Sequence, residues 1–379
     1  MPSFSSLLSF VVLAAVVSAA PSQTDTAKRA TCTVNSVASA SGLSSCTNVV
    51  IEAFTVPAGE TVTIAAASGA TVTMTGDITF AKTTGKSSTF GSKCIFIDTF
   101  VVSGPLITFN TPNINFNGGS HRIDGNGALY WDGQGTNGGS FKPHPFVKFQ
   151  GYGTFSSVTV LNSPAQAISV GTTATSTIEQ VTVDNSAGDS LGHNTDGFDI
   201  SASGVTITNS KVMNQDDCVA VNSGDSVTIE NTTCTGGHGI SIGSIATGKS
   251  VTNFRATGNT VSNSKYGLRI KVDANASGAK VSGATYSGNT ISGISDYGIL
   301  ISQSYPTEDG STVGTGAPIS GVAFTGAKTT LAVDSSAFSV VVNCGACTGT
   351  WDWSELDVTS AGQGHKLSVD QAKISGGTY

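Results

Sequence analysis

The sequence predicts an all-β chain, folded as a single-domain right-handed parallel β-helix with a short N-terminal cap. Three observations lead to this prediction. Gly, Ser, Thr, Asn and Val are abundant throughout, whereas the helix formers Glu, Lys, Arg and Leu are scarce. Short strands with apolar residues at alternate positions recur along the middle of the chain. Their period of roughly 20 to 30 residues, with several strands per repeat, is typical of a coil whose turns stack on one another.

The N-terminus predicts a secreted protein. Leu7 to Ala19 is an apolar run that is too short to span a bilayer, and it ends in small residues that suit cleavage. We therefore interpret residues 1–20 as a signal peptide. Lys28-Arg29 resembles a dibasic processing site, which makes 21–29 a pro-segment. Residues 30–379 contain no linker, charge block or shift in composition and are expected to form the one β-helix domain.

Seven cysteines in a secreted chain predict disulfides and one unpaired thiol. Proximity in sequence suggests the pairs Cys32–Cys46, Cys218–Cys234 and Cys344–Cys347, with Cys94 left over. The first pair would staple the cap, expected at 33–54 with a short helix. The Cys-x-x-Cys at 344–347 could instead serve redox or metal chemistry, but no second such motif or nearby His supports this. Asn231 and Asn275 begin sequons for N-glycosylation.

The repeat is clearest in five four-residue segments that have apolar residues at positions one and three. They are spaced 21, 21, 28 and 31 residues apart, at 198–201, 219–222, 240–243, 268–271 and 299–302. Equivalent residues of neighbouring turns should lie about 4.8 Å apart. A β-sandwich or propeller is the alternative. Sandwich strands are more often longer and joined by hairpin turns, so the repeat favours the coil.

The charge balance excludes some partners. Removal of residues 1–29 takes away Lys28, Arg29 and Asp25 and leaves a net charge of −8. Nucleic acid is therefore not expected as a partner, and no later stretch could span a membrane. Nothing in the sequence predicts a metal, a cofactor or an oligomer, so we expect a monomer. An acidic polymer could bind only through a locally basic cleft.

Ionisable residues occupy one position of the repeat. Asp196, Asp217 and His238 each lie two residues before a predicted strand, at intervals of 21 residues. They should stack in one column, with Asp216 beside it and pointing differently. In 268–271 strand alternation puts Arg269 and Lys271 together on the outer face, just along the coil. A single Asp in such a turn is more often structural. Like charges packed this closely favour a functional site.

Four motifs at these positions resemble the signatures of a known family. They are Asn194-Thr195-Asp196, Gln215-Asp216-Asp217, Gly237-His238-Gly239 and Arg269-Ile270-Lys271. In order and spacing they are similar to those of the polygalacturonases, pectin-hydrolysing glycosidases with a parallel β-helix fold. The likeness extends to 124–127 and 130–133, and Tyr305 falls where the family has a substrate-contacting Tyr. Fungal members usually carry a further cysteine pair near the C-terminus, which 353–379 lacks.

The resemblance implies endo-acting hydrolysis of α-1,4-galacturonosyl bonds in polygalacturonate and pectin, with inversion. Asp216 would be the general acid, while Asp196 and Asp217 would activate water. His238 would tune the acid or bind substrate. The substrate-binding residues would be Asn194, Gln215, Arg269, Lys271 and Tyr305.

Four alternatives remain open at this point. An exo-acting enzyme would differ mainly in loops that close one end of the groove, and a relative could prefer a substituted pectin backbone. A Ca²⁺-dependent pectate lyase could use the same aspartates as oxygen ligands. A non-catalytic carbohydrate-binding β-helix would need aromatic platforms along its groove, and aromatic residues are few here.

Overall fold

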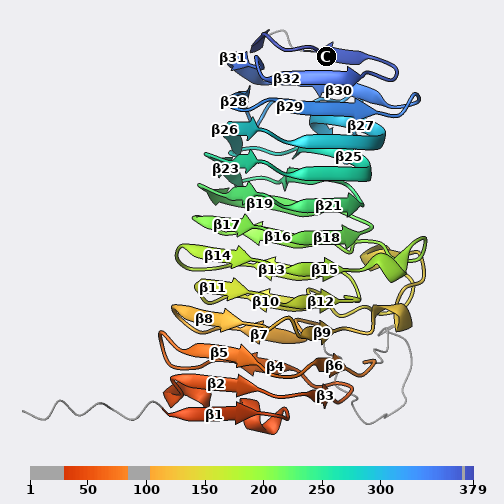
Figure 1. Ribbon diagram of the computed structural model, residues 1–379. Coiled ribbons are helices and arrows are strands. Elements are labelled where there is room, and N and C mark those ends of the chain that lie inside the picture. Colours follow the sequence, from red (N-terminus) through yellow and green to blue (C-terminus); the bar gives the residue numbers. More distant parts are fainter. Residues whose placement is uncertain (1–29, 84–102, 369–371) are drawn as a thin grey trace, which may run out of the picture.

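The computed structural model describes residues 30–83, 103–368 and 372–379 (Figure 1). The expected signal peptide, the pro-segment and Cys94 lie outside these residues. The described chain winds into a single tall coil, with the N-terminal cap at one end and the C-terminus at the other (Figure 1). Its strands pair in parallel between successive turns, as the repeat predicts.

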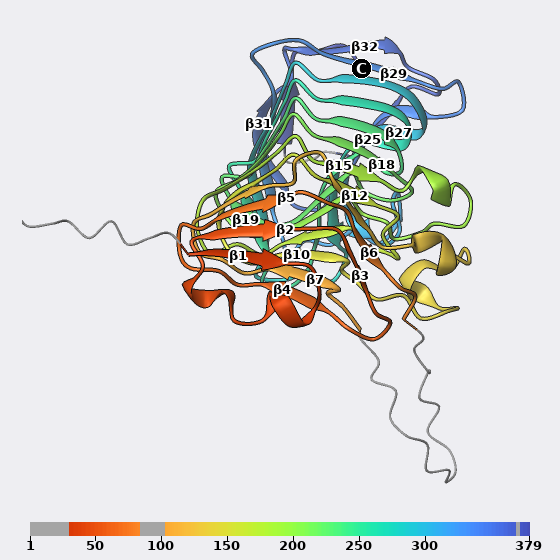
Figure 2. The same cartoon turned by 60° about the horizontal axis from the view of Figure 1, so that its bottom comes forward.

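Three ladders of parallel strands form the walls of the coil, seen toward one end in Figure 2. The ladder that carries the predicted motifs contains β4 (Val62–Ile64), β7 (Ile107–Phe109), β10 (Val147–Phe149), β13 (Ile168–Val170), β16 (Phe198–Ser201), β19 (Val219–Asp225), β22 (Ile240–Ile245), the second halves of β25 (Thr260–Asp273) and β27 (Thr290–Tyr305), β30 (Phe338–Asn343) and β33 (His365–Ser368). We call it the motif ladder.

The second ladder contains β1 (Thr31–Val34), β2 (Asn48–Ile51), β5 (Thr71–Met74), β8 (Ile114–Asn117), β11 (Gly153–Ser156), β14 (Ser176–Glu179), β17 (Val205–Thr208), β20 (Thr228–Glu230), β23 (Ser250–Thr252), β24 (Arg255–Thr257), β26 (Lys280–Ser287), β28 (Ile319–Phe324), β31 (Cys347–Asp352) and β34 (Ala372–Ser375). The third contains β3 (Phe54–Val56), β6 (Ile78–Phe80), β9 (Arg122–Asp124), β12 (Thr159–Leu161), β15 (Thr182–Asp184), β18 (Lys211–Asn214), β21 (Thr233–Gly236), the first halves of β25 and β27, β29 (Thr329–Val333) and β32 (Leu356–Ser360).

The register confirms the predicted repeat. Phe198 pairs with Val219, Val219 with Ile240, Ile240 with Leu268 and Leu268 with Ile299. The prediction of uniformly short strands is wrong for the later turns. There the strands of two ladders merge into β25, which has 14 residues, and β27, which has 16. The motif segments are the ends of these long strands.

Helical structure among the described residues is confined to five short 3-10 turns: η1 (Ala38–Ala40), η2 (Leu43–Ser45), η3 (Gly127–Leu129), η4 (Gly135–Asn137) and η5 (Ser186–Gly188). The first two form the expected cap helix, in 3-10 and not α geometry. The described residues contain no helix that is both long and apolar enough to cross a bilayer.

Inward-facing side chains form one continuous core along the coil. Because equivalent residues stack between turns, like packs on like. Phe116 and Phe155 are fully buried and stack with ring centroids 4.5 Å apart. This leaves the outward side chains of each strand free for a surface site.

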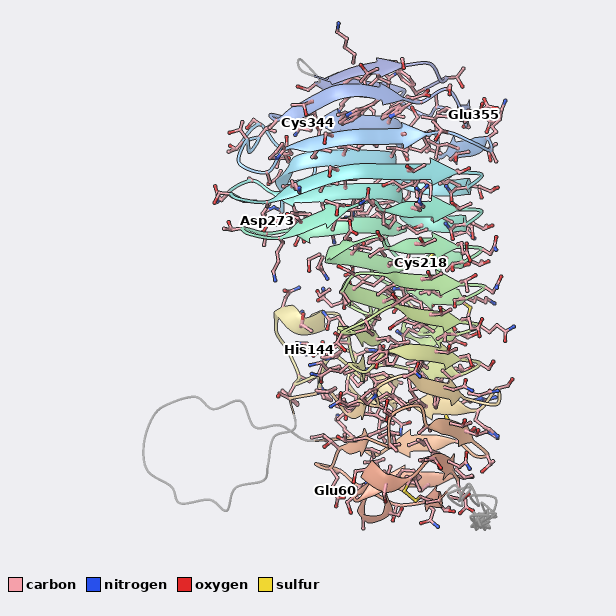
Figure 3. All side chains as sticks on the ribbon, turned by 90° about the vertical axis from the view of Figure 1, so that its left-hand side faces the viewer. Glu60, His144, Cys218, Asp273, Cys344 and Glu355 are labelled. Carbon is pink, nitrogen blue, oxygen red and sulfur yellow. A yellow bond between two sulfur atoms is a disulfide. The ribbon has the colours of Figure 1, made fainter. Side chains whose placement is uncertain are left out.

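Disulfides join Cys32 to Cys46, Cys218 to Cys234 and Cys344 to Cys347. Figure 3 shows Cys218 near the middle of the coil and Cys344 toward its C-terminal end. The last pair closes the Cys-x-x-Cys motif, so its cysteines are not free to hold a metal. The sequon residues Asn231 and Asn275 are both exposed, and their glycosylation stays a prediction.

Candidate active site

An acidic cleft of about 330 Å³ opens on the outer face of the motif ladder, where β16, β19, β22 and β25 meet. We use the name acidic cleft for this cavity and its lining. The lining residues are Asn194, Asp196, Asp199, Asp216, Ala220, Asn222, His238, Gly243, Ser244, Lys265, Tyr266, Arg269, Lys271, Tyr305 and Glu308. Seven of the nine catalytic or substrate-binding residues predicted from the sequence line it, and Asp217 and Gln215 do not.

Asp216 is held by donors on both carboxylate oxygens. Its Oδ1 accepts hydrogen bonds from Nδ1 of His238 at 2.9 Å and from the backbone N–H of Asp217 at 2.8 Å. Its Oδ2 faces Nδ2 of Asn194 at 3.4 Å. Burial raises the pKa of Asp216, but the hydrogen bond and charge of His238, the charge of Lys271 and the backbone N–H of Asp217 together lower the pKa to about 2. The free site therefore favours Asp216 in its ionised form.

The sharp turn before β22 sets the position of His238. Gly239 has a φ of +70°, and a Cβ on it would lie 2.1 Å from the carbonyl oxygen of Gly267 on the next turn. Only glycine fits such a backbone approach. The His238 side chain is thereby presented to the cleft, where its ring lies 5.2 Å from that of Tyr266, centroid to centroid.

Asp217 turns away from the cleft. The expectation that Asp196 and Asp217 face the same side, with Asp216 pointing elsewhere, is therefore wrong for the side chain of Asp217. Its backbone lies in register with that of Asp196, but its side chain is fully buried. Its oxygens accept hydrogen bonds from Arg269 at 2.6 Å, Lys271 at 2.6 Å and Ser241 at 2.8 Å. Of the three predicted catalytic aspartates, only Asp196 and Asp216 line the cleft. The prediction failed because the repeat fixes the backbone position and not the direction of the side chain.

Asp196 binds a proton more readily than an ordinary carboxyl group. Burial, followed by the charges of Asp199, Asp216 and Asp217, raises its pKa well above the ordinary value, and Lys271 offsets only part of this. Its Oδ1 accepts no hydrogen bond from the described residues.

Sequence reasoning missed Asp199, the outward residue of β16. Burial, then the charge of Asp217, raises its pKa to about 7. It pairs across the ladder with Ala220 and lies on the cleft lining beside Asp216. The alternation of Phe198-Asp199-Ile200 was sufficient to place this carboxyl on the same face as Arg269, since strand neighbours of the ladder share a face.

Arg269 and Lys271 face the cleft side of β25, as alternation predicts, but both are nearly buried. Arg269 donates to Asp217, to Ser241 at 3.1 Å and to Glu308 at 3.1 Å. Its guanidinium carbon also lies 4.4 Å from the ring centroid of Tyr266. The Nζ of Lys271 lies 5.4 Å from the ring of Tyr305. These contacts hold both cations in fixed positions beside the carboxylates.

Glu308 and Tyr266 were also missed. Glu308 follows β27 in a turn without periodicity, so no repeat pattern could place it. Tyr266 lies in the bend of β25, where Tyr297 of the next turn stacks on it at 5.9 Å.

Gln215 lies outside the acidic cleft, so the structure does not place it for the expected substrate contact. Its Nε2 donates to the carbonyl of Asn185 at 2.7 Å, and its Oε1 accepts from the hydroxyl of Thr195 at 2.9 Å. Both ends of the amide are used to connect neighbouring turns below the cleft.

A metal ion fits the cleft poorly. Asp216, Asp217 and His238 each offer one ligand atom, all within 4.8 Å of one another. Asp217 is already neutralised by Arg269 and Lys271, and these cations would repel a divalent ion.

Carboxyl groups of differing proton affinity, a histidine and two cations in one cleft define a class of protein, the glycoside hydrolases. Such enzymes cleave glycosidic bonds with a pair of carboxyl groups, one of them protonated. The chain belongs to this class and to one family in it: the model described as "Glycosyl hydrolases family 28" matches residues 46–375, most of the chain.

Relatives that match over nearly their full length have names consistent with this family. The polygalacturonase of Cochliobolus carbonum is 41% identical over 91% of this chain and 92% of its own length. The endo-polygalacturonase of Sclerotinia sclerotiorum is 40% identical over 98% of both. Among solved structures, endopolygalacturonase I from Stereum purpureum, complexed with two galacturonate, is 55% identical with a TM-score of 0.86. It covers 92% of this chain and 100% of its own.

Proposed function

We propose that this protein is a secreted, endo-acting hydrolase of the α-1,4-galacturonosyl bonds of polygalacturonate. The observation that carries the proposal is the acidic cleft, where Asp196, Asp216 and His238 lie beside the fixed cations Arg269 and Lys271. The relatives support the substrate and the endo mode, since they are named polygalacturonase or endopolygalacturonase.

We assign the chemical roles as follows. Asp216 protonates the leaving glycosidic oxygen, and Asp196 activates the water that attacks the sugar. Asp217, which the sequence predicted as the partner of Asp196, is buried behind the cleft and acts through Arg269 and Lys271, which it holds in place. Water as the direct nucleophile gives inversion, with no covalent sugar intermediate. His238 holds Asp216 through its 2.9 Å hydrogen bond.

The order of proton affinities in the free cleft runs against these roles, because Asp196 binds a proton more readily than Asp216. A uronate carboxylate entering the cleft adds a negative charge, which raises the proton affinity of every nearby carboxyl, Asp216 included. The assignment of Asp216 as the acid therefore requires the proton to lie on Asp216 and not on Asp196 in the substrate complex.

Recognition of the acidic polymer falls to the cations. Arg269 and Lys271 are positioned to hold a galacturonate carboxylate beside the scissile bond, and Arg can do so with two parallel hydrogen bonds. Tyr305 packs beside Lys271, and Asn194 is a further polar residue of the cleft lining. Asp199, neutral at mildly acidic pH, can donate a hydrogen bond to a sugar oxygen.

The test is the release of reducing ends from de-esterified polygalacturonate, with and without EDTA, alongside viscosity and ultraviolet absorbance. We expect new reducing ends and an early fall in viscosity, no absorbance from unsaturated product, and no effect of EDTA. An EDTA-sensitive rise in absorbance would make the protein a lyase. Reducing ends with constant viscosity would make it exo-acting. A protein that binds polygalacturonate but releases no product, even from decorated pectins, would be a binding module.

A monomer is expected, and size-exclusion chromatography with light scattering would test it. Mass spectrometry of the protein exported by its native host would test cleavage after residues 20 and 29 and glycosylation of Asn231 and Asn275.

A further inference from the structure

A projecting segment, residues 130–142, stands beside the acidic cleft and is not part of the stacked strands. We call it the arm. It contains η4 and leaves the coil on the same side as η5 (Figures 1 and 2). In Figure 3 it stands out from the coil close to His144. Its base is fixed by Trp131, whose indole N–H donates to the carbonyl of Ser163 at 3.1 Å.

An ion pair between a buried lysine and a partly exposed aspartate closes the arm on itself. The side chain of Lys142 is only 1% exposed, and its Nζ lies 2.7 Å from Oδ1 of Asp132. The other oxygen of Asp132 accepts the backbone N–H of Ser140 at 2.6 Å and its hydroxyl at 2.8 Å. The hydrogen bond from Lys142, then that from Ser140, lowers the pKa of Asp132. A buried lysine is rare without such a partner, and removing one member leaves the other uncompensated. The pair therefore fixes the two ends of the arm together.

The tip of the arm donates hydrogen bonds to one atom of the cleft lining, Oδ1 of Asn194. Three donors converge on it: the backbone N–H of Thr136 at 3.0 Å, the Thr136 hydroxyl at 3.2 Å and Nδ2 of Asn137 at 3.2 Å. Gly135 makes the approach possible, since a Cβ there would lie 2.3 Å from the same oxygen. Three donors on one oxygen settle which end of the amide is which.

The other end of that amide meets the catalytic carboxyl. With Oδ1 held by the arm, Nδ2 of Asn194 is directed at Oδ2 of Asp216, 3.4 Å away. Asn194 itself has a φ of +51°, a conformation that Asn tolerates better than most residues. The contacts thus run from the arm through Asn194 to Asp216.

We propose that the arm is a positioning device for Asp216, that it acts through the Asn194 amide, and that the Asp132–Lys142 pair sets its geometry. The role of Asp216 as the acid rests on the proposed function, whereas the physical link from the arm to the Asp216 carboxyl does not. Thr136, Asn137, Asp132 and Lys142 are positioning residues in this scheme and not catalytic ones.

The link has a direction that can be measured. A donor on Oδ2 stabilises the ionised form of Asp216, so its loss raises the proton affinity of that carboxyl. The other charged groups that face Asp216 come from the neighbouring turns and are untouched by changes in the arm: Asp196, Asp199, Asp217, His238, Arg269 and Lys271.

The principal variant is the double substitution Thr136→Val with Asn137→Ala, which removes two of the three donors at exposed positions. We expect kcat on polygalacturonate to fall roughly ten- to a hundredfold with KM within about twofold, since small misplacements of a reacting group have such effects. The pH profile should move to higher pH. Lys142→Met should act in the same direction. Gln134→Ala, an exposed change on the same arm, is the matched control and should leave kcat, KM and the profile unchanged.

A second measurement needs no substrate. Titration of the Asp216 carboxyl by NMR, assigned by comparison with Asp216→Asn, should show a higher pKa in the double variant than in the wild type and in Gln134→Ala. An inactive wild type would overturn the proposed function but leave this titration to decide the role of the arm. An unchanged Asp216 titration in the double variant would overturn the positioning role. So would a rise in KM at constant kcat, which would mean that the arm contacts substrate instead.

Discussion

The substitution Asp217→Asn, combined with a second change at Lys271, should separate the role of Asp217 in stability from its role in activity. In the wild type this fully buried carboxylate neutralises Lys271 and shares Arg269 with Glu308. An amide can still accept from Arg269 but turns an N–H donor or a neutral oxygen toward Lys271. Lys271 has no other ion-pair partner among the described residues, so the variant leaves a nearly buried ammonium uncompensated.

The magnitude follows from that orphaned charge. Removing one partner of a buried ion pair costs about 3–5 kcal/mol. An unfolding entropy of about 2.1 cal/mol/K per residue over about 350 residues gives about 1.4 °C per kcal/mol, so the Tm should fall by about 4–7 °C. Adding Lys271→Met removes the orphaned charge and should restore most of this loss. The double variant should nevertheless stay inactive, because neither the carboxylate nor the ammonium is present.

Scanning calorimetry at fixed pH and reducing-end release on the same preparations would check both parts. Asp309→Asn is the control, because it breaks the partly exposed pair with Lys366 and should cost no more than about 1 kcal/mol. A double variant no more stable than Asp217→Asn would refute the account of Lys271 as an orphaned charge. Recovery of activity in the double variant would remove Asp217 from the mechanism.

Three further predictions concern the cleft. Asp216→Asn should lower kcat at least a hundredfold with a modest change in KM, as general acid catalysis typically contributes 10²–10⁴; near-normal turnover would show that the acid is another group. Lys271→Ala should mainly raise the KM for polygalacturonate, and an unchanged KM would exclude it from uronate binding. Burial and the charge of Asp217 raise the pKa of Asp199 from 3.8 to about 7, so the folded state binds this proton more tightly than the unfolded state. The stability it contributes is complete below pH 3.8 and is lost as the pH rises through 7. Asp199→Asn should therefore flatten the fall in Tm over this window, and an unchanged slope would contradict the burial argument.

The sequence predicted what the repeat controls. The 21-residue intervals placed Asp196 and Asp217 on neighbouring turns, and alternation placed Arg269 and Lys271 on one face; the strand register confirms both. These features are properties of the backbone, and in a stacked coil the backbone of one turn determines that of the next.

Two kinds of feature could not be predicted from the sequence. The direction of the Asp217 side chain is decided by attraction to cations that lie 52 and 54 residues later in the chain. Glu308 and the arm come from irregular turns between strands, where no period relates sequence to position. Asp199 is different, because its outward position in β16 was accessible from alternation alone.

The stacked ladders also determine how the protein tolerates damage. Each turn touches only the turn before it and the turn after it, so stability is close to a sum of nearest-neighbour terms. The acidic cleft draws on successive turns from β16 to β27, with several turns stacked on either side (Figure 1). Fraying of β33 and β34, or proteolytic trimming there, removes terminal contacts while the central turns keep their own. Loss of the outer turns therefore leaves in place the part of the coil that carries the acidic cleft.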